Sequence, residues 1–452
     1  MINNTPQREN FGSKIGIIMA SAGSAIGLGN IWKFPYEAGK NGGAAFIFIY
    51  LGAILLVGFS IMIAEYVIGR RGGKNMVGSF KTLAPKSYWW LTSILGIVAA
   101  VAILSFYGVV AGWTLEYLFQ ALKNSFVGKT PEVFGQEFTT FIQHPFRPLI
   151  WQILFMGLTC MLIVSGVQKG IERYARILMP ILFITIIALA IRSITLPGAS
   201  EGISFIFKPD FSVISAHTVL NALGLAFFSL SLGMGTIITY GSYVSKDTNL
   251  ISTSLQVIFL DTMIAILAGL AIFPAVFAYG IEPGSGPSLV FITLPNIFQQ
   301  MPGGMIWGVM FFLLLSVAAL TSSVSLLEVT TAYVSEEFKI SRKAATIGGT
   351  IVITLVGIFC SFSQGIWADF KILGLNIFDF LDVLSSNYLL PLGGFIISIF
   401  VGWKMSKKDL YDELSQGAKI NAIAFNILRV VLRYIAPIAI VLVFMNKVGI
   451  IK

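Results

Sequence analysis

Long apolar stretches separated by short polar segments dominate the chain between residues 14 and 446. A helix that crosses a bilayer needs about 20 predominantly apolar residues, and the stretches have about that length or more. The pattern predicts an all-α polytopic membrane protein with eleven spans, at residues 14–38, 42–69, 88–121, 149–167, 175–196, 218–244, 251–279, 303–335, 344–363, 373–402 and 422–446.

Composition supports a chain embedded in lipid. Hydrophobic residues make up 56% of the sequence and charged residues only 11%, whereas a soluble domain carries about 25% charged residues. So few charges cannot cover a water-facing surface, which excludes a soluble domain and a disordered protein. The two cysteines, Cys160 and Cys360, lie inside apolar stretches, so we expect neither a disulfide nor a cysteine metal site.

The basic residues indicate an orientation rather than a nucleic-acid partner. The net charge is +9, but Lys and Arg occur in short clusters between the apolar stretches. With residues 1–13 in the cytoplasm, the inside segments carry more than twice as many Lys and Arg as the outside segments. Cytoplasmic loops of membrane proteins are enriched in these residues. We therefore expect the N-terminus inside and, with an odd number of spans, the C-terminus outside.

Two spans contain clusters of glycine near their middle. Residues 22–30 include Gly23, Gly27 and Gly29, and residues 227–235 include Gly233 and Gly235. Small residues can serve close helix packing. Alternatively, paired interruptions in the first and sixth spans indicate a transport site between two repeated halves. An unwound helix offers free carbonyls to a small cation and positive half-helix ends to an anionic group, as an amino-acid carboxylate with Na⁺ would require.

Polar side chains within the apolar stretches are further candidates. Thr321, Ser322 and Ser323 either bond back to their own helix and bend it, or they offer oxygen ligands to a cation. Asp261 lies in the middle of the seventh span, where it is either a cation ligand or an acid kept neutral by desolvation. Glu65, late in the second span, is placed to accept hydrogen bonds from an unwound backbone, as a structural acid.

No pattern in the chain indicates an enzyme. We find no Walker loop, no His/Cys/Asp cluster with metal-ligand spacing and no Ser-His-Asp grouping. Lys33, Arg8, Glu336 and Asp382 lie near span ends, where charged side chains commonly reach toward the membrane surface.

The glycine-rich run closely resembles the opening signature of the neurotransmitter:sodium symporter family. The similarity begins at residues 23–35 and Asn41-Gly42-Gly43, continues through 229–235 and 318–323, and extends over essentially the whole chain. The sequence looks like a bacterial eleven-span member that transports hydrophobic amino acids across the cytoplasmic (inner) membrane. The resemblance implies the leucine-transporter fold, with two inverted five-span repeats (14–196 and 218–402), helices 1 and 6 unwound mid-membrane, and a peripheral span (422–446).

The resemblance also implies a substrate site. The substrate carboxylate would meet the backbone amides of Leu28 and Gly29, the Tyr107 hydroxyl and one sodium ion. The amine would meet carbonyl groups of Ala25, Phe228 and Ser231, with Ser229 beside them. The side-chain pocket would be apolar and roomy enough for a branched, aromatic or thioether side chain, lined by Ile103, Phe228, Ser231, Met234, Ser322 and Leu326.

Two sodium sites follow from the same resemblance. The first would use the Ala25 carbonyl, Asn30, Ser229, Asp261 and the substrate itself. The second would use carbonyls of Gly23, Ile26 and Ala318 with the hydroxyls of Thr321 and Ser322. All of these ligands are oxygen atoms, as a hard cation requires. Many members have Asn where this chain has Asp261, and the extra negative charge here leads us to expect transport without chloride.

Two gates are implied as well. Lys33 with Asp382 would close the outer side, although the family usually has Arg at the first position and Lys lacks the bidentate fork of Arg. Arg8 with Glu336 would close the inner side, helped by Ser242 and Tyr243.

The predicted function is sodium-coupled symport of hydrophobic L-amino acids by alternating access. One alternative is a proton-coupled carrier of the same fold, with Lys14 or Asp261 titrating. Another is a channel or an amino-acid sensor, although channels tend to show repeated pore motifs or charged rings and none is apparent.

Overall fold

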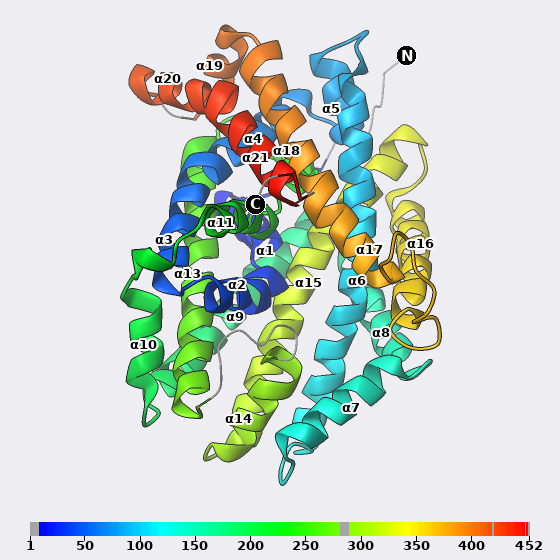
Figure 1. The fold of residues 1–452 in the computed structure, drawn as a ribbon. Helices are drawn as coiled ribbons and strands as arrows, with labels where there is room; N and C mark the ends of the chain where they lie inside the picture. Colours follow the sequence, from blue (N-terminus) through cyan, green and yellow to red (C-terminus); the bar gives the residue numbers. More distant parts are fainter. Residues whose placement is uncertain (1–8, 281–288, 418–419, 448, 451–452) are drawn as a thin grey trace.

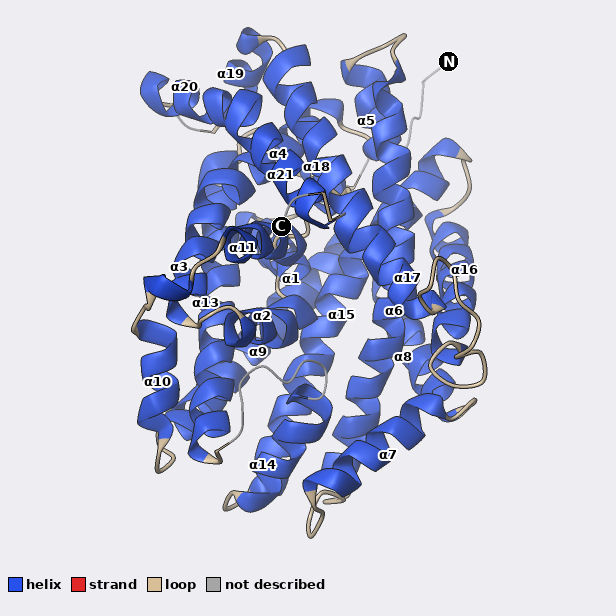
Figure 2. Ribbon diagram, in the orientation of Figure 1, coloured by secondary structure: helices blue, strands red, loops and turns tan. Residues whose placement is uncertain are grey.

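The structure is a computed structural model that describes residues 9–280, 289–417, 420–447 and 449–450. Helices form nearly all of this part of the chain, and the segments that connect them are mostly short (Figure 2). The fold is therefore all-α, as the apolar pattern predicts.

Nine continuous helical segments in the described part of the chain are long and apolar enough to cross a membrane. Some contain a π-helical turn, so that two α-helices form one span. In chain order they comprise α3 (Ala44–Ala53) with α4 (Phe59–Gly72), α6 (Leu91–Leu122), α8 (Arg147–Val164), α9 (Arg173–Ile194), α13 (Leu250–Ala278), α15 (Gly304–Glu337), α16 (Arg342–Phe362), α17 (Ile377–Val383) with α18 (Leu390–Ile399), and α20 (Ala422–Val430) with α21 (Ala436–Lys447).

The first and sixth predicted spans are both broken. Helix α1 (Lys14–Ala25) is followed by the π-helical turn η1 (Gly29–Lys33) and by α2 (Phe34–Lys40), and the two parts are bent by 50°. Helix α11 (Ala216–Ser229) is separated from α12 (Thr236–Gly241) by residues 230–235. With these two broken spans, all eleven predicted spans have a counterpart. The division into two inverted repeats and a peripheral span stays a prediction.

Hydrogen bonds gather the predicted inside segments at one end of the molecule and the predicted outside segments at the other. Arg70 at the end of α4 donates to the Thr248 carbonyl oxygen at 2.6 Å. At the opposite end, Lys129 donates its backbone N–H to Gln299 at 3.1 Å. The short helices follow this division (Figure 1): α5 (Met76–Leu83) and α19 (Lys407–Ser415) lie at one end, and α7 (Pro131–Gln143), α10 (Ala199–Phe207) and α14 (Leu294–Gln300) at the other.

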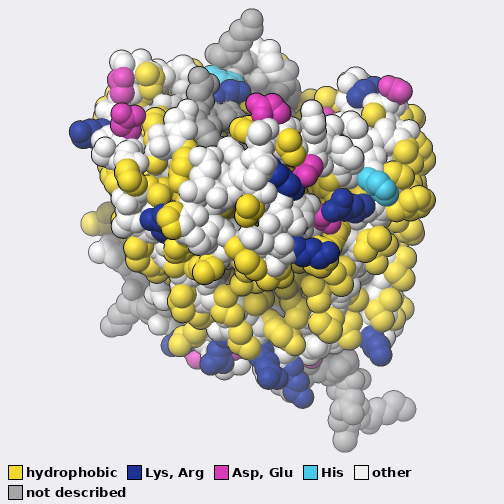
Figure 3. Space-filling model, turned by 90° about the horizontal axis from the view of Figure 1, so that it is seen from below, with side chains coloured by type: hydrophobic (Ala, Val, Ile, Leu, Met, Phe, Trp, Pro, Cys, Tyr) yellow, Lys and Arg dark blue, Asp and Glu magenta, His cyan; other side chains and the backbone are white. Residues whose placement is uncertain are grey.

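The outer surface has the character expected for contact with lipid. Large hydrophobic side chains are exposed along several spans, including Ile150, Ile184, Phe259, Val352 and Ile438, each at least 57% exposed. Figure 3 shows hydrophobic side chains forming a broad band, with Lys and Arg side chains beneath it. A band of this kind is what a bilayer core would cover.

Helices α4 and α12 pack so closely that side chains are excluded between them. A Cβ atom at Gly69 would lie 2.0 Å from the Ile238 carbonyl oxygen, and one at Gly241 would lie 3.0 Å from the Tyr66 carbonyl oxygen. Glycine at both positions lets the two backbones touch, as is common between membrane helices.

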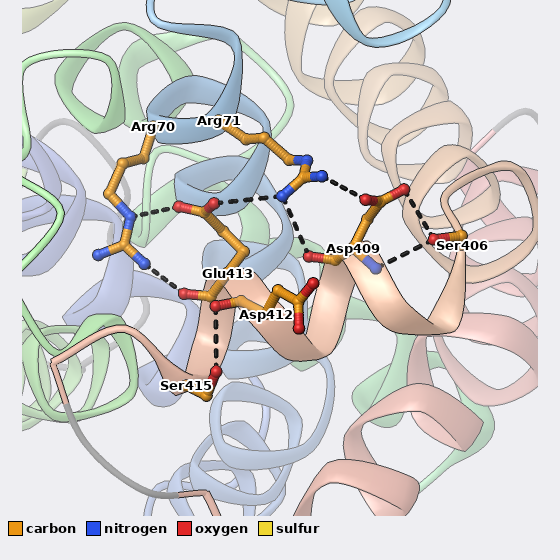
Figure 4. Close-up of polar contacts among 7 residues, drawn as sticks. All are labelled: Arg70, Arg71, Ser406, Asp409, Asp412, Glu413 and Ser415. Carbon is orange, nitrogen blue, oxygen red and sulfur yellow. Dashed lines mark hydrogen bonds and ion pairs between the residues drawn. The ribbon is translucent and has the colours of Figure 1, made fainter.

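Helix α19 is attached to α4 by buried and half-buried ion pairs (Figure 4). Arg70 donates through Nε to the Glu413 carboxylate at 2.5 Å and through a second nitrogen to the Glu413 carbonyl oxygen at 2.5 Å. The neighbouring Arg71 pairs with Asp409. Arg70 also binds the Thr248 carbonyl oxygen. Its guanidinium group therefore connects three elements: α4, α19 and the segment that precedes α13.

Candidate functional site

The gap between α11 and α12 is held open by backbone conformation and by one buried acid. Ser231, Gly233 and Gly235 have φ angles of +55°, +82° and +81°, which end the helical hydrogen-bonding pattern. A Cβ atom at Gly233 would lie 2.4 Å from the Leu390 carbonyl oxygen, so the close approach also requires glycine there. Glu65, fully buried in α4, accepts the backbone N–H of Gly233 at 2.7 Å.

The predicted first sodium set lies where this gap faces the break after α1. Asn30, Ser229 and Asp261 come from three separate spans, and each is at most 1% exposed. The Ser229 hydroxyl lies 3.0 and 3.1 Å from the two Asp261 carboxylate oxygens. Ala25 is the last residue of α1, directly before the break. A carboxylate, a hydroxyl and free backbone carbonyls form a donor set that suits a hard cation.

The Asn30 side chain directs its amide nitrogen toward Asp261 and Ser229, whereas a cation ligand would direct its amide oxygen there. Its amide nitrogen donates to Asp261 Oδ1 at 2.7 Å and to Ser229 at 3.2 Å, while its Oδ1 accepts the Gly27 N–H at 3.2 Å. Turning the amide would present the oxygen to Asp261 and Ser229. The sequence placed Asn30 in this cluster but gives no information about which amide atom faces it.

The predicted second sodium set is assembled between α1 and α15. The Thr321 hydroxyl lies 3.4 Å from the Ile26 carbonyl oxygen and 3.0 Å from the Ala318 carbonyl oxygen. The Ser322 hydroxyl lies 3.5 Å from the Gly23 carbonyl oxygen and 3.3 Å from that of Ile26. All five predicted oxygen atoms therefore converge, and their chemistry fits a small hard cation. The Thr321 hydroxyl bonds back to its own helix, as one alternative predicts, and it also reaches α1; cation binding by this cluster stays a prediction.

A cavity of about 180 Å³ lies next to the two breaks. Four predicted substrate contacts line it, namely Leu28, Gly29, Tyr107 and Phe228. The Tyr107 hydroxyl accepts the backbone N–H of Leu28 at 3.2 Å, so this side chain already touches the broken segment. The remaining predicted contacts do not line this cavity and are buried at 7% exposure or less: Ala25, Ile103, Ser229, Ser231, Met234, Ser322 and Leu326.

The proposed outer gate is not joined in this structure. Lys33 and Asp382 both line the cavity, but within the described chain no ion pair of 4.0 Å or less connects them. The Lys33 ammonium lies instead 4.1 Å from the centre of the Phe228 ring, in a cation–π contact. The Asp382 carboxylate accepts the Ser386 hydroxyl at 2.9 Å.

The proposed inner gate is partly described. Arg8 lies outside the described residues. Glu336 accepts the backbone N–H and the side-chain amide of Asn75 at 2.8 and 3.0 Å. Ser242 donates to the Thr239 carbonyl oxygen at 2.5 Å, and the Tyr243 carbonyl oxygen accepts the Phe11 N–H at 3.0 Å.

A second buried ion pair lies beside this gate. Glu328 is fully buried and accepts two hydrogen bonds from the Arg342 guanidinium, at 2.8 and 2.6 Å, and one from the Tyr243 hydroxyl at 2.6 Å. The sequence singled out neither Arg342 nor this pairing. Glu328 could have indicated the pairing, because a carboxylate in an apolar span needs a partner.

The chain matches the sodium:neurotransmitter symporter family over residues 8–133 and 137–452. It is 41% identical over 442 residues to a sodium-dependent transporter of Bacillus subtilis, covering 98% of each chain. It is 31% identical over 432 residues to a sodium-dependent transporter of Methanocaldococcus jannaschii, covering 92% of this chain and 86% of the other.

Among solved structures, the crystal structure of MhsT in complex with L-phenylalanine is 49% identical in sequence, with a TM-score of 0.91, covering 98% of this chain and 100% of that chain. The broken spans and the matches over nearly the full length agree. The chain therefore belongs to the sodium:neurotransmitter symporter family and is a sodium-dependent membrane transporter, not an enzyme, with the leucine-transporter fold.

Proposed function

We propose that the protein imports hydrophobic L-amino acids together with sodium by alternating access. The observation that carries this proposal is the meeting of two oxygen-rich clusters with the ends of broken helices, next to a cavity lined mainly by apolar and aromatic side chains. L-Phenylalanine in the 49% identical MhsT supports a large hydrophobic side chain as the preferred substrate class.

The substrate would lie between the two breaks. Its carboxylate would bind the amides of Leu28 and Gly29 and the Tyr107 hydroxyl, since Tyr107 already hydrogen-bonds Leu28. Its amine would bind carbonyl oxygens of Ala25, Phe228 and Ser231. Its side chain would lie between Phe228, which lines the cavity, and five buried residues: Ile103, Ser231, Met234, Ser322 and Leu326.

Sodium is a second cargo in this scheme, with one ion in each cluster. The ion at Asp261 would contact the substrate carboxylate, which links the binding of the two cargoes. The ion at Thr321 and Ser322 would tie α1 to α15 and favour one of the two access states. Coupling requires such a difference in affinity between states, because equal affinity for both shifts no population.

Access would alternate between the outer cavity at Lys33 and Asp382 and an inner opening closed by Arg8, Glu336, Ser242 and Tyr243. The Glu328–Arg342 pair would support the inner closure, since it holds the Tyr243 hydroxyl. We place the protein in a bacterial cytoplasmic membrane with the N-terminus inside and the C-terminus outside. The grouping of the predicted inside segments at one end of the fold supports this orientation.

The test is radiolabelled uptake into proteoliposomes that contain the full-length protein, with a panel of competing amino acids. We expect saturable uptake against a gradient, driven by sodium and competed by aromatic, branched and thioether amino acids. Replacing sodium by choline should stop it. Uptake driven by a pH gradient without sodium would indicate a proton-coupled carrier, and binding without accumulation would indicate a sensor or channel.

Chloride should not be required for uptake. Asp261 supplies a fixed negative charge beside the proposed first sodium, so an additional anion is unnecessary there. Uptake should therefore be unchanged when gluconate replaces chloride at constant sodium. A collapse of the rate in gluconate would contradict this expectation.

A further inference from the structure

The corner at which α18 meets α21 is built around one arginine. Two π-helical turns, η8 (Phe400–Lys404) and η9 (Val431–Ile435), approach each other closely, and a Cβ atom at Gly402 would lie 2.9 Å from the Leu432 carbonyl oxygen. The Trp403 indole N–H donates to the Arg433 carbonyl oxygen at 2.9 Å. The Arg433 guanidinium carbon lies 4.3 Å from the Trp403 ring centre, so the arginine is stacked on the indole and fixed in place.

No acidic side chain among the described residues pairs with this arginine. Among the described residues, no carboxylate lies within 4.0 Å of Arg433, nor of Arg429 one helical turn before it. The Arg433 Nε is buried and makes no hydrogen bond to the described protein. A buried donor without a partner is costly. Because the Nε is buried, an acceptor from outside the chain would meet the terminal nitrogens of this guanidinium instead.

Two of the three acids of α19 are paired with arginines of α4, and the third, Asp412, is exposed. Asp409 and Glu413 of α19 are bound to Arg71 and Arg70 of α4 (Figure 4). The lysines of the same stretch are exposed: Lys404, Lys407 and Lys408. Among the described residues of this stretch, Asp412 is the one acid without an ion pair to α4, so the basic residues outnumber the acids that remain to offset them.

The corner also lies at about the depth of lipid headgroups. The last part of the span, η9 and α21, runs for 5 and 12 residues. At about 1.5 Å per residue this is about 25 Å, close to the thickness of a hydrocarbon core of about 30 Å. Trp403 and Tyr434 are 51% and 47% exposed there, and such aromatic side chains are typical of the membrane interface.

We propose that this corner, formed by Trp403, Lys404, Arg429, Arg433 and Tyr434, binds the phosphate of an anionic phospholipid. The planar guanidinium on Trp403 offers paired donors to phosphate oxygens. Arg429 and the lysines add long-range attraction, and the exposed apolar side chains of Ile435 and Ile438 lie where acyl chains would run. With the orientation proposed above, the lipid belongs to the cytoplasmic leaflet.

The test is native mass spectrometry of the full-length protein in detergent, titrated with phosphatidylglycerol or phosphatidylcholine. The wild-type protein should bind phosphatidylglycerol more tightly. R433Q should weaken that binding about fivefold, as expected for one basic group at an anionic headgroup, and should leave phosphatidylcholine binding unchanged. R433K keeps the charge but not the stacked fork, so it should restore part of the affinity and should fold even if R433Q does not.

The matched control is R192Q. Arg192 also lies near a tryptophan, with its guanidinium carbon 5.9 Å from the Trp307 ring centre, but at the opposite end of the molecule and without a cluster of lysines. It should have no effect on lipid binding. Equal losses in R192Q and R433Q, no loss in R433Q and R433K, or full displacement of the lipid by inorganic phosphate would each overturn the proposal.

Discussion

Replacing Asp261 by asparagine is expected to weaken sodium-dependent uptake strongly while the protein still folds. Asp261 is fully buried and lies 3.0 Å from the Ser229 hydroxyl and 2.7 Å from the Asn30 amide nitrogen. The asparagine has nearly the same shape and keeps one oxygen ligand, but it removes the negative charge beside the proposed first sodium. Losing one member of a buried charge pair costs about 3–5 kcal/mol, so sodium affinity should fall by about a hundredfold or more.

Uptake as a function of sodium concentration in proteoliposomes measures this effect, and thermal unfolding in detergent checks that D261N is folded. D369N serves as the control, because Asp369 is exposed and should tolerate the change. If D261N kept the sodium dependence of the wild-type protein, the negative charge of Asp261 would not contribute to sodium binding.

Replacing Arg70 by alanine should give the largest loss of stability. The Arg70 side chain is 1% exposed and the Glu413 side chain 4% exposed. The substitution leaves the buried carboxylate with only the more distant Arg71 guanidinium, at 3.7 Å, and the Thr248 carbonyl oxygen without its donor. Breaking a buried pair from one side costs about 3–5 kcal/mol. The thermal unfolding temperature in detergent should drop strongly.

The matched control for R70A is K81A. Lys81 pairs with Glu337 at 2.8 Å, but its side chain is 50% exposed. An exposed pair contributes about 0–1 kcal/mol, so K81A should shift the unfolding temperature little. Similar shifts for R70A and K81A would mean that the contact between α4 and α19 adds no more stability than a surface pair.

The sequence was sufficient to predict the spans and the place of the breaks. Apolar length alone located all eleven segments, and the glycines at 27, 29, 233 and 235 marked the interruptions. The polar residues in apolar surroundings were equally informative, since Asp261, Glu65 and Thr321 all lie against a broken helix. A buried polar group needs a hydrogen-bond partner. Its presence in an apolar span therefore indicates that other polar groups lie beside it.

The partners of the basic residues were not predictable in the same way. Arg70 was counted as one of the loop charges that orient the chain, but it is buried against Glu413, 343 residues away. Arg342 likewise lies at the start of a span in the sequence and binds the buried Glu328. Whether an arginine near a span end contacts water or a carboxylate depends on how distant segments of the chain pack. The local hydrophobicity of the sequence does not predict that packing.

The glycine contact between α4 and α12 has a mechanical consequence. The two backbones touch at Gly69 and Gly241, Glu65 holds the Gly233 amide above that contact, and Arg70 holds Thr248 below it. Three attachments at successive levels leave these helices no freedom to slide or twist past each other. In the proposed alternating-access cycle we therefore expect them to move as one rigid body, with the hinge on either side of the pair and not between its members.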